Sequence, residues 1–181
     1  SVRDAAIDLG WTSGRFKDLH LSGTIEIENG TGNVGVGKQA LNSNTASENT
    51  AFGYQALYTT STGGANTALG DRAGFGVTNG TGNTFIGQGS GYSMTGGSKN
   101  TILGSYNGNE HGLDIRTSSN NIVLSDGDGN PRLYISSGGA LNVEGLDSLT
   151  TASAANVFIA TDGFLKKSTS SLRYKNTVND A

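Results

Sequence analysis

The chain has 181 residues, with 29 glycines, one proline, no cysteine and a formal net charge of −3. The absence of cysteine excludes disulfides and thiolate metal sites. Without a basic cluster we expect no nucleic-acid partner, because such binding requires cations to neutralise phosphates. No run of about 18 apolar residues exists, so we expect no membrane insertion. Abundant turn residues between short β-branched and aromatic runs predict an all-β fold.

Residues 1–28 differ in sequence from the rest of the chain. Two β-favouring runs, 16–21 and 24–28, are separated by Ser22-Gly23. This pattern predicts an N-terminal β element or cap. The chain opens on Ser1 and its only methionine is Met94, so we expect it to be part of a longer polypeptide.

Residues 29–112 form a repeat array in which asparagines at 33, 49, 66, 83 and 100 set a period of about 17. In each unit the asparagine leads, a large apolar residue follows three positions later, and a glycine closes the segment. A short fixed period indicates stacked coils, here a β-roll or β-helix-like fibre. The repeated positions are Asn33, Asn49, Asn66, Asn83 and Asn100; Val36, Phe52, Leu69, Ile86 and Leu103; and Gly53, Gly70, Gly87 and Gly104.

Strand alternation in each unit places Thr50 and Phe52 on one face and Ala51 on the other. We expect the large residue to point into the core and the glycine to turn the corner. The aligned threonines Thr50, Thr67, Thr84 and Thr101 could form an ice-binding ladder, although Val34 and Ile122 interrupt it at both ends. We favour asparagines and threonines that satisfy each other's hydrogen bonds inside the stack.

A single coil of this array carries too little apolar surface to fold alone. Ordering each residue costs roughly 1–2 kcal/mol, whereas burying one large side chain contributes only about 1.5–3 kcal/mol. Neighbouring coils and other chains must supply the difference. We therefore expect a tight homotrimer, with Phe52, Leu69, Ile86 and Leu103 buried and some of them near its axis.

Residues 113–168 predict a β-meander with a hairpin. Strand-like runs alternate with turn residues, and Asp162-Gly163 is a hairpin turn signal. The expected strands are 121–124, 132–135, 140–143, 156–161 and 164–167.

Three patterns suggest ligand sites, and a simpler interpretation is favoured for each. Residues 30–35 match G-x-G-x-x-G, but a repeat unit follows instead of the helix that a dinucleotide site needs. Asp126 and Asp128 look like half a calcium loop, yet the glutamate expected at position 12 is replaced by Ser137, and a hairpin turn is favoured. His20 and His111 have no partner at a metal-binding spacing. We expect no cofactor, no metal and no enzymatic site.

The repeats "NTAFGYQALYTTSTGGANTALG" (49–70) resemble the head repeats of trimeric autotransporter adhesins and, more closely, segments of bacteriophage tail-fibre and tailspike proteins. The runs at 8–23 and 125–139 are similar to sequences that accompany such repeats in phage fibres. This resemblance implies a trimeric fibre segment on a virion, which would present its surface to a host glycan or protein.

Residues 169–181 contain "SSLRYKNTVNDA", which resembles the opening of the intramolecular chaperone domain of endosialidases and many phage fibres. That family cleaves itself off after folding. The resemblance implies a cut after Ser170, with Ser170 as nucleophile and Lys175 as its helper. Arg173 matches the family's arginine, while Ser171 stands where aspartate is usual. A serine needs a base, and lysine can act as one when desolvated. We expect no cleavage without the chaperone body.

Two hypotheses follow from these observations. The first is a structural and host-recognition segment of a phage tail fibre, whose chaperone domain assists its folding. The alternative is the head of a trimeric adhesin on a bacterial surface, which binds host matrix or glycan. The sequence at 170–175 favours the first, because adhesins of that class end in a membrane anchor.

Overall fold

The computed structural model describes residues 32–144 and two short strands, β11 (Val157–Ile159) and β12 (Leu165–Lys167). The described residues form strands, turns and loops without a helix, which confirms the all-β prediction. β11 and β12 pair antiparallel, with Val157 opposite Lys167, as expected for a hairpin, and the expected turn at Asp162-Gly163 lies outside the described residues.

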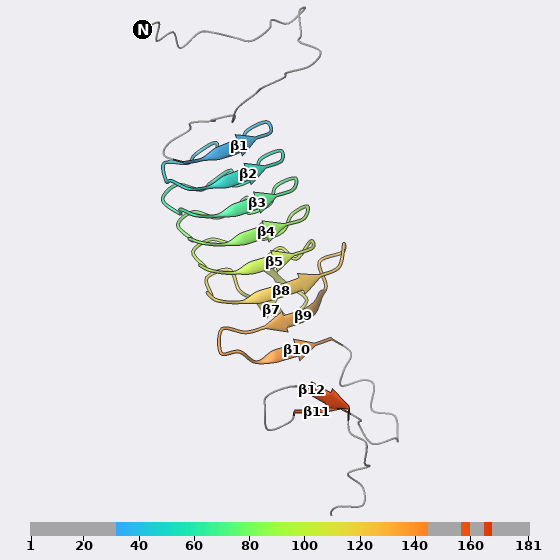
Figure 1. Ribbon diagram of the computed structural model, residues 1–181. Helices are drawn as coiled ribbons and strands as arrows, with labels where there is room; N and C mark the ends of the chain where they lie inside the picture. The colour runs from blue at the N-terminus through green and yellow to red at the C-terminus, as the bar shows by residue number, and fades with distance from the viewer. Residues whose placement is uncertain (1–31, 145–156, 160–164, 168–181) are drawn as a thin grey trace, which may run out of the picture.

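Short parallel strands stack one per turn and form one wall of a β-solenoid (Figure 1). Their register is constant: Thr50 pairs with Thr67, and Thr67 with Thr84. The wall consists of β1 (Val34–Val36), β2 (Thr50–Phe52), β3 (Thr67–Leu69), β4 (Thr84–Ile86), β5 (Thr101–Leu103) and β8 (Ile122–Ser125).

The pairing becomes antiparallel at the C-terminal end of the wall. β8 pairs parallel with β5 and antiparallel with β9 (Pro131–Ile135), and β10 (Leu141–Val143) continues the same sheet. A separate two-stranded hairpin, β6 (Asn109–Glu110) and β7 (Leu113–Asp114), is inserted between β5 and β8. This insertion accounts for the longer step from Asn100 to Asn121, because the extra residues leave the stack and return to it.

A ladder of buried asparagines connects successive turns. The backbone N–H of Asn66 donates to Oδ1 of Asn49 at 2.9 Å, and that of Asn83 donates to Oδ1 of Asn66 at 2.9 Å. From Asn33 to Asn100 each side-chain amide also donates to the return segment of its own turn, as from Asn66 to the carbonyl of Gly80 at 2.8 Å. The ladder comprises Asn33, Asn49, Asn66, Asn83, Asn100 and Asn121, each at most 1% exposed.

The large apolar residue of each strand does not point into the core of its own chain, so that prediction is wrong. The middle residues, such as Ala51 and Phe85, are fully buried, whereas Phe52 is 55% exposed. The position of Asn49 explains which residues of the strand face inward. Because Asn49 must face inward to bind the return segment, alternation directs Thr50 outward, Ala51 inward and Phe52 outward. The same holds for Leu69, Ile86 and Leu103, which are 46%, 39% and 36% exposed.

The narrow core is filled by complementary small and large residues. In the N-terminal turns the strands contribute small residues such as Ala51, and the opposite wall contributes Leu41 and Leu57. At β4 the strand contributes Phe85, and the opposite wall has Gly74 and Gly91. A Cβ on Gly74 would lie 2.8 Å from a ring carbon of Phe85. The large core side chain thus comes from the opposite wall in the N-terminal turns and from the strand at β4.

Candidate functional site

The outward side chains of β1–β5 and β8 form a surface that we call the strand face. It has two columns along the stack, and neither contains a charged residue. The large side chains of the second column are all 36–55% exposed. Contiguous apolar patches of this kind on soluble proteins mark interaction sites. The first column is Val34, Thr50, Thr67, Thr84, Thr101 and Ile122; the second is Val36, Phe52, Leu69, Ile86, Leu103 and Leu124.

A corner glycine follows each of the strands β1–β5 at one edge of this face. Gly53 and Gly70 have φ values of 145° and 142°. A Cβ on Gly53 would overlap the carbonyl group of Gly70 in the next turn. Glycine therefore permits both the backbone conformation and the close stacking of turns. The residue before each corner glycine consequently recurs at the same position in every turn.

The threonine ladder exists, but on the outside of the stack. Thr50 and Thr67 are exposed, and Thr84 and Thr101 are half-buried. The expectation that these threonines and the asparagines satisfy each other inside the stack is correct only for the asparagines. The threonine hydroxyls line the strand face beside the apolar column.

Past the corner glycines, the flank of the solenoid carries a stack of aromatic rings. Tyr58 and Phe75 have ring centroids 5.1 Å apart with planes inclined by 3°, and Phe75 and Tyr92 follow at 4.9 Å and 9°. Beside them, the Arg72 guanidinium lies over the Tyr54 ring, 5.8 Å from its centroid. Sequence reasoning missed this stack, although its residues each lie five positions after a corner glycine.

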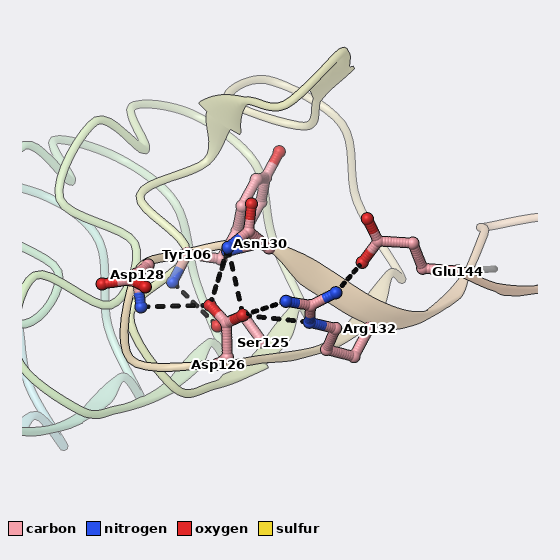
Figure 2. Close-up of polar contacts among 7 residues, drawn as sticks. All are labelled: Tyr106, Ser125, Asp126, Asp128, Asn130, Arg132 and Glu144. Atoms are coloured by element: carbon pink, nitrogen blue, oxygen red, sulfur yellow. Dashed lines mark hydrogen bonds and ion pairs between the residues drawn. The ribbon is translucent and has the colours of Figure 1, made fainter.

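The turn between β8 and β9 contains the half calcium loop, and its carboxylate is engaged within the chain (Figure 2). Oδ1 of Asp126 accepts the backbone N–H groups of Asp128 at 3.0 Å and Asn130 at 2.9 Å. Oδ2 accepts from Nε of Arg132 at 2.9 Å, and Arg132 also pairs with Glu144 at 2.8 Å. Asp126 thus organises a hairpin turn, as the sequence predicted.

Electrostatics fit this structural role. Desolvation opposes ionisation of Asp126, but hydrogen bonds from Arg132 and Asn130 outweigh it and lower its pKa to about 2. Tyr106 is a fully buried titratable residue that follows β5, and its hydroxyl donates to the carbonyl of Leu113 at 2.6 Å. Desolvation by burial, with the charges of Asp114 and Glu110, raises the pKa of Tyr106 far above its usual value. Tyr106 therefore stays neutral and acts as a packing residue.

The candidate catalytic residues Ser170 and Lys175, with Ser171 and Arg173, lie outside the described residues, as does His20. His111 is exposed in the turn between β6 and β7. Among the described residues, no group of three or more His, Asp or Glu side chains is arranged to hold a metal ion. The same residues include no helix long and apolar enough to span a bilayer.

Comparisons with models of protein families, with curated proteins and with solved structures found no match to this chain. The geometry of the chain itself supplies the functional lead. Its distinguishing feature is the strand face, which presents two uncharged side chains in each of these turns of the solenoid.

Proposed function

We propose that this chain is a structural and host-recognition segment of a homotrimeric phage-type tail fibre. In this arrangement the strand faces of three copies pack around an axis that runs along the solenoids. The observation that supports the proposal is the charge-free strand face, with Phe52, Leu69 and Ile86 at its centre and 55%, 46% and 39% exposed in the single chain.

The partner that best fits this face is another copy of the same chain. Each turn from β2 to β5 presents one threonine and one large apolar residue at a constant rise, and a second solenoid repeats at the same rise. The face also lacks charges that would have to be desolvated on contact. Burying the exposed half of each large side chain would contribute on the order of 1 kcal/mol, repeated along the wall and in each copy.

The large apolar residues of the second column make an ice-binding role for the threonines unfavourable. Its members differ in size and shape, from Val36 to Phe52 and Ile86, and protrude beside the hydroxyls. Such a surface is not a regular lattice of hydroxyl groups. Interdigitating side chains of varied shape are instead typical of a protein interface core, where packing density matches that of interiors.

The phage assignment and the virion location are supported by sequence resemblance, both in the repeats and at residues 170–175. A β-solenoid of stacked coils is equally compatible with the adhesin head on a bacterial surface. The resemblance to the self-cleaving chaperone favours the fibre, and the chaperone would be the partner of the chain during folding.

The test is the oligomeric state of the purified chain, measured by sedimentation equilibrium and native mass. We expect a trimer for the unmodified protein. Leu69→Lys puts a charge at the centre of the strand face and should yield monomers or aggregates. Thr62→Lys adds the same charge at an exposed position on the return segment and should remain trimeric. A folded, stable monomer of the unmodified chain would refute the proposal.

A further inference from the structure

The flank of the solenoid has a hollow of about 170 Å³ where one side chain is missing from a regular column. The column occupies the second position after each corner glycine and consists of Gln39, Gln55, Arg72 and Gly89. Within the column, Nε2 of Gln55 donates to Oε1 of Gln39 at 3.0 Å. At Gly89 the column stops and the hollow opens.

Backbone conformation does not require glycine at position 89. Gln39, Gln55 and Arg72 have φ values of 61°, 54° and 53°, and Gly89 has 65°. Three residues with side chains thus adopt the same left-handed conformation in the same place. A Cβ on Gly89 would meet no atom within 4 Å. The glycine therefore leaves space that the fold could have filled.

The walls of this hollow combine an aromatic ring with polar groups of both signs. Tyr92 ends the aromatic stack here: one ring face covers Phe75, and no further ring continues the stack in the described part of the chain. Asp71 and Arg72 supply a carboxylate and a guanidinium, and Nε2 of Gln88 donates to Oδ2 of Asp71 at 3.4 Å. Ser105 and Gly127, the latter in the β8–β9 turn, also line the hollow.

These groups match the surface of a sugar. A pyranose ring has C–H groups that pack on an aromatic ring and vicinal hydroxyls that both donate and accept. Asp71 accepts hydrogen bonds, Arg72 donates them and Gln88 does both. Asp71 disfavours an anion and Arg72 disfavours a cation, so a neutral ligand fits best. The volume is below the roughly 300–1,000 Å³ of sites for drug-sized ligands, which suits one ring.

We propose that this hollow binds a single neutral sugar ring of a surface glycan. The glycan as the biological ligand rests on the proposed host-recognition role, whereas the binding site itself does not depend on the number of chains. Weak binding at one site would be multiplied in an oligomeric fibre, because each copy adds an identical site.

The experiment is saturation-transfer NMR on the protein in its native assembly, with the methyl glycosides of glucose, galactose, mannose and N-acetylglucosamine as probes. We expect transfer to the ring protons of at least one sugar. Gly89→Gln restores the residue type of the column and fills the hollow, and should weaken binding by on the order of tenfold or more. Asp71→Ala should also weaken it.

Gly112→Gln is the matched control, because Gly112 also has a positive φ, of 80°, and open space around its Cβ position. This variant should bind as the unmodified protein does. No transfer to any of the four sugars, equal binding by Gly89→Gln, or phosphate binding in place of sugar binding would overturn the proposal. Sedimentation of the same samples reports assembly separately, so loss of sugar binding and loss of the trimer are distinguishable.

Discussion

The backbone N–H of Asn83 donates to the side-chain Oδ1 of Asn66, one turn away, at 2.9 Å. Asn83 then repeats the role for the next turn, since its own Oδ1 accepts the N–H of Asn100 at 2.9 Å. Each asparagine is thus both donor and acceptor in a buried chain that crosses every turn. Such a chain fixes the register of the turns, because a slip of one residue would leave buried amides without partners.

The first prediction concerns this ladder. Asn83→Ala removes the acceptor for Asn100 and the donor for the carbonyl of Gly97, which Nδ2 of Asn83 reaches at 2.9 Å. Each buried group left without a partner costs about 1–3 kcal/mol. We expect a loss of roughly 2–5 kcal/mol in the free energy of unfolding, measured by denaturant titration.

Asn79→Ala serves as the control for the ladder prediction, because Asn79 is exposed in the return segment of the preceding turn. Its effect should stay within about 0.5 kcal/mol. Equal effects of the two substitutions would contradict a structural role for the ladder.

The second prediction concerns the space beside Gly91 that the Phe85 ring fills. A Cβ on Gly91 would overlap the Phe85 ring. Gly91→Ala should therefore destabilise the chain by about 1–3 kcal/mol through overpacking. Gly112→Ala, at a positive φ but in open space, measures the conformational part of this cost alone. The measurement is again denaturant unfolding.

A double variant separates the clash from backbone strain. Phe85→Leu shortens the ring position, so Gly91→Ala should be less damaging in the Phe85→Leu background than in the unmodified chain. This coupling between contacting residues is measured by a double-mutant cycle. Additive effects would show that Phe85 is not the cause.

The chain shows which parts of a solenoid are readable from sequence. The asparagine period predicted the turns, and the glycine after Phe52 predicted the corner, because both depend on local chemistry. Alternation also placed Thr50 and Ala51 on opposite faces. It could not tell which face was inside, since Ala51 is smaller than Phe52 and hydrophobicity favours the wrong answer. The bonds of Asn49 decide the matter, and they involve Gly63, 14 residues away.

The flank was less accessible to sequence reasoning. Tyr58, Phe75 and Tyr92 recur at the repeat period, as do Arg72 and Gly89 in their column, so the signal was present. The alanines in the same segments drew the interpretation toward core packing, so the periodic aromatic residues were not recognised as a surface stack. The boundary formed by Gly127 depends on how the β8–β9 turn folds back, which no local pattern specifies.

The third prediction concerns acid stability. The pKa of Asp126 is lowered to about 2 in the folded chain, against about 3.9 in an unfolded chain. A lowered folded-state pKa contributes stability that is complete above the unfolded value and is lost as the pH falls through the folded value. The melting temperature of the unmodified protein should thus decline between about pH 4 and pH 2.

Asp126→Asn should lower the melting temperature at neutral pH and flatten its dependence in that acidic window. Arg132→Met removes the guanidinium that binds the carboxylate and should have a similar effect. Thermal unfolding at about pH 7, 4 and 2.5 checks both variants. An unchanged slope in Asp126→Asn would show that other carboxylates dominate the acid response.

The last prediction concerns the bond between Ser170 and Ser171, in a segment whose resemblance to the self-cleaving chaperone junction includes Ser170, Arg173 and Lys175. In a longer chain that carries such a chaperone, we expect cleavage at this bond after assembly, with dependence on Ser170 and Lys175. Lysine acts as a base only when a desolvating environment lowers its pKa, so residues 1–181 alone should stay intact. Once the chaperone is released, the fibre would persist by kinetic stability, because the refolding template is gone.

The test is expression of that longer chain with Ser170→Ala, with Lys175→Ala and with Ser171→Ala, followed by mass analysis of the products. The first two should abolish the product that ends at residue 170. Ser171→Ala is the matched control, because it removes a hydroxyl on the other side of the same bond and should still be cut. If Ser171→Ala alone blocks cleavage, the nucleophile has been assigned to the wrong serine. If none of the three blocks it, the segment is a linker cut by another protease.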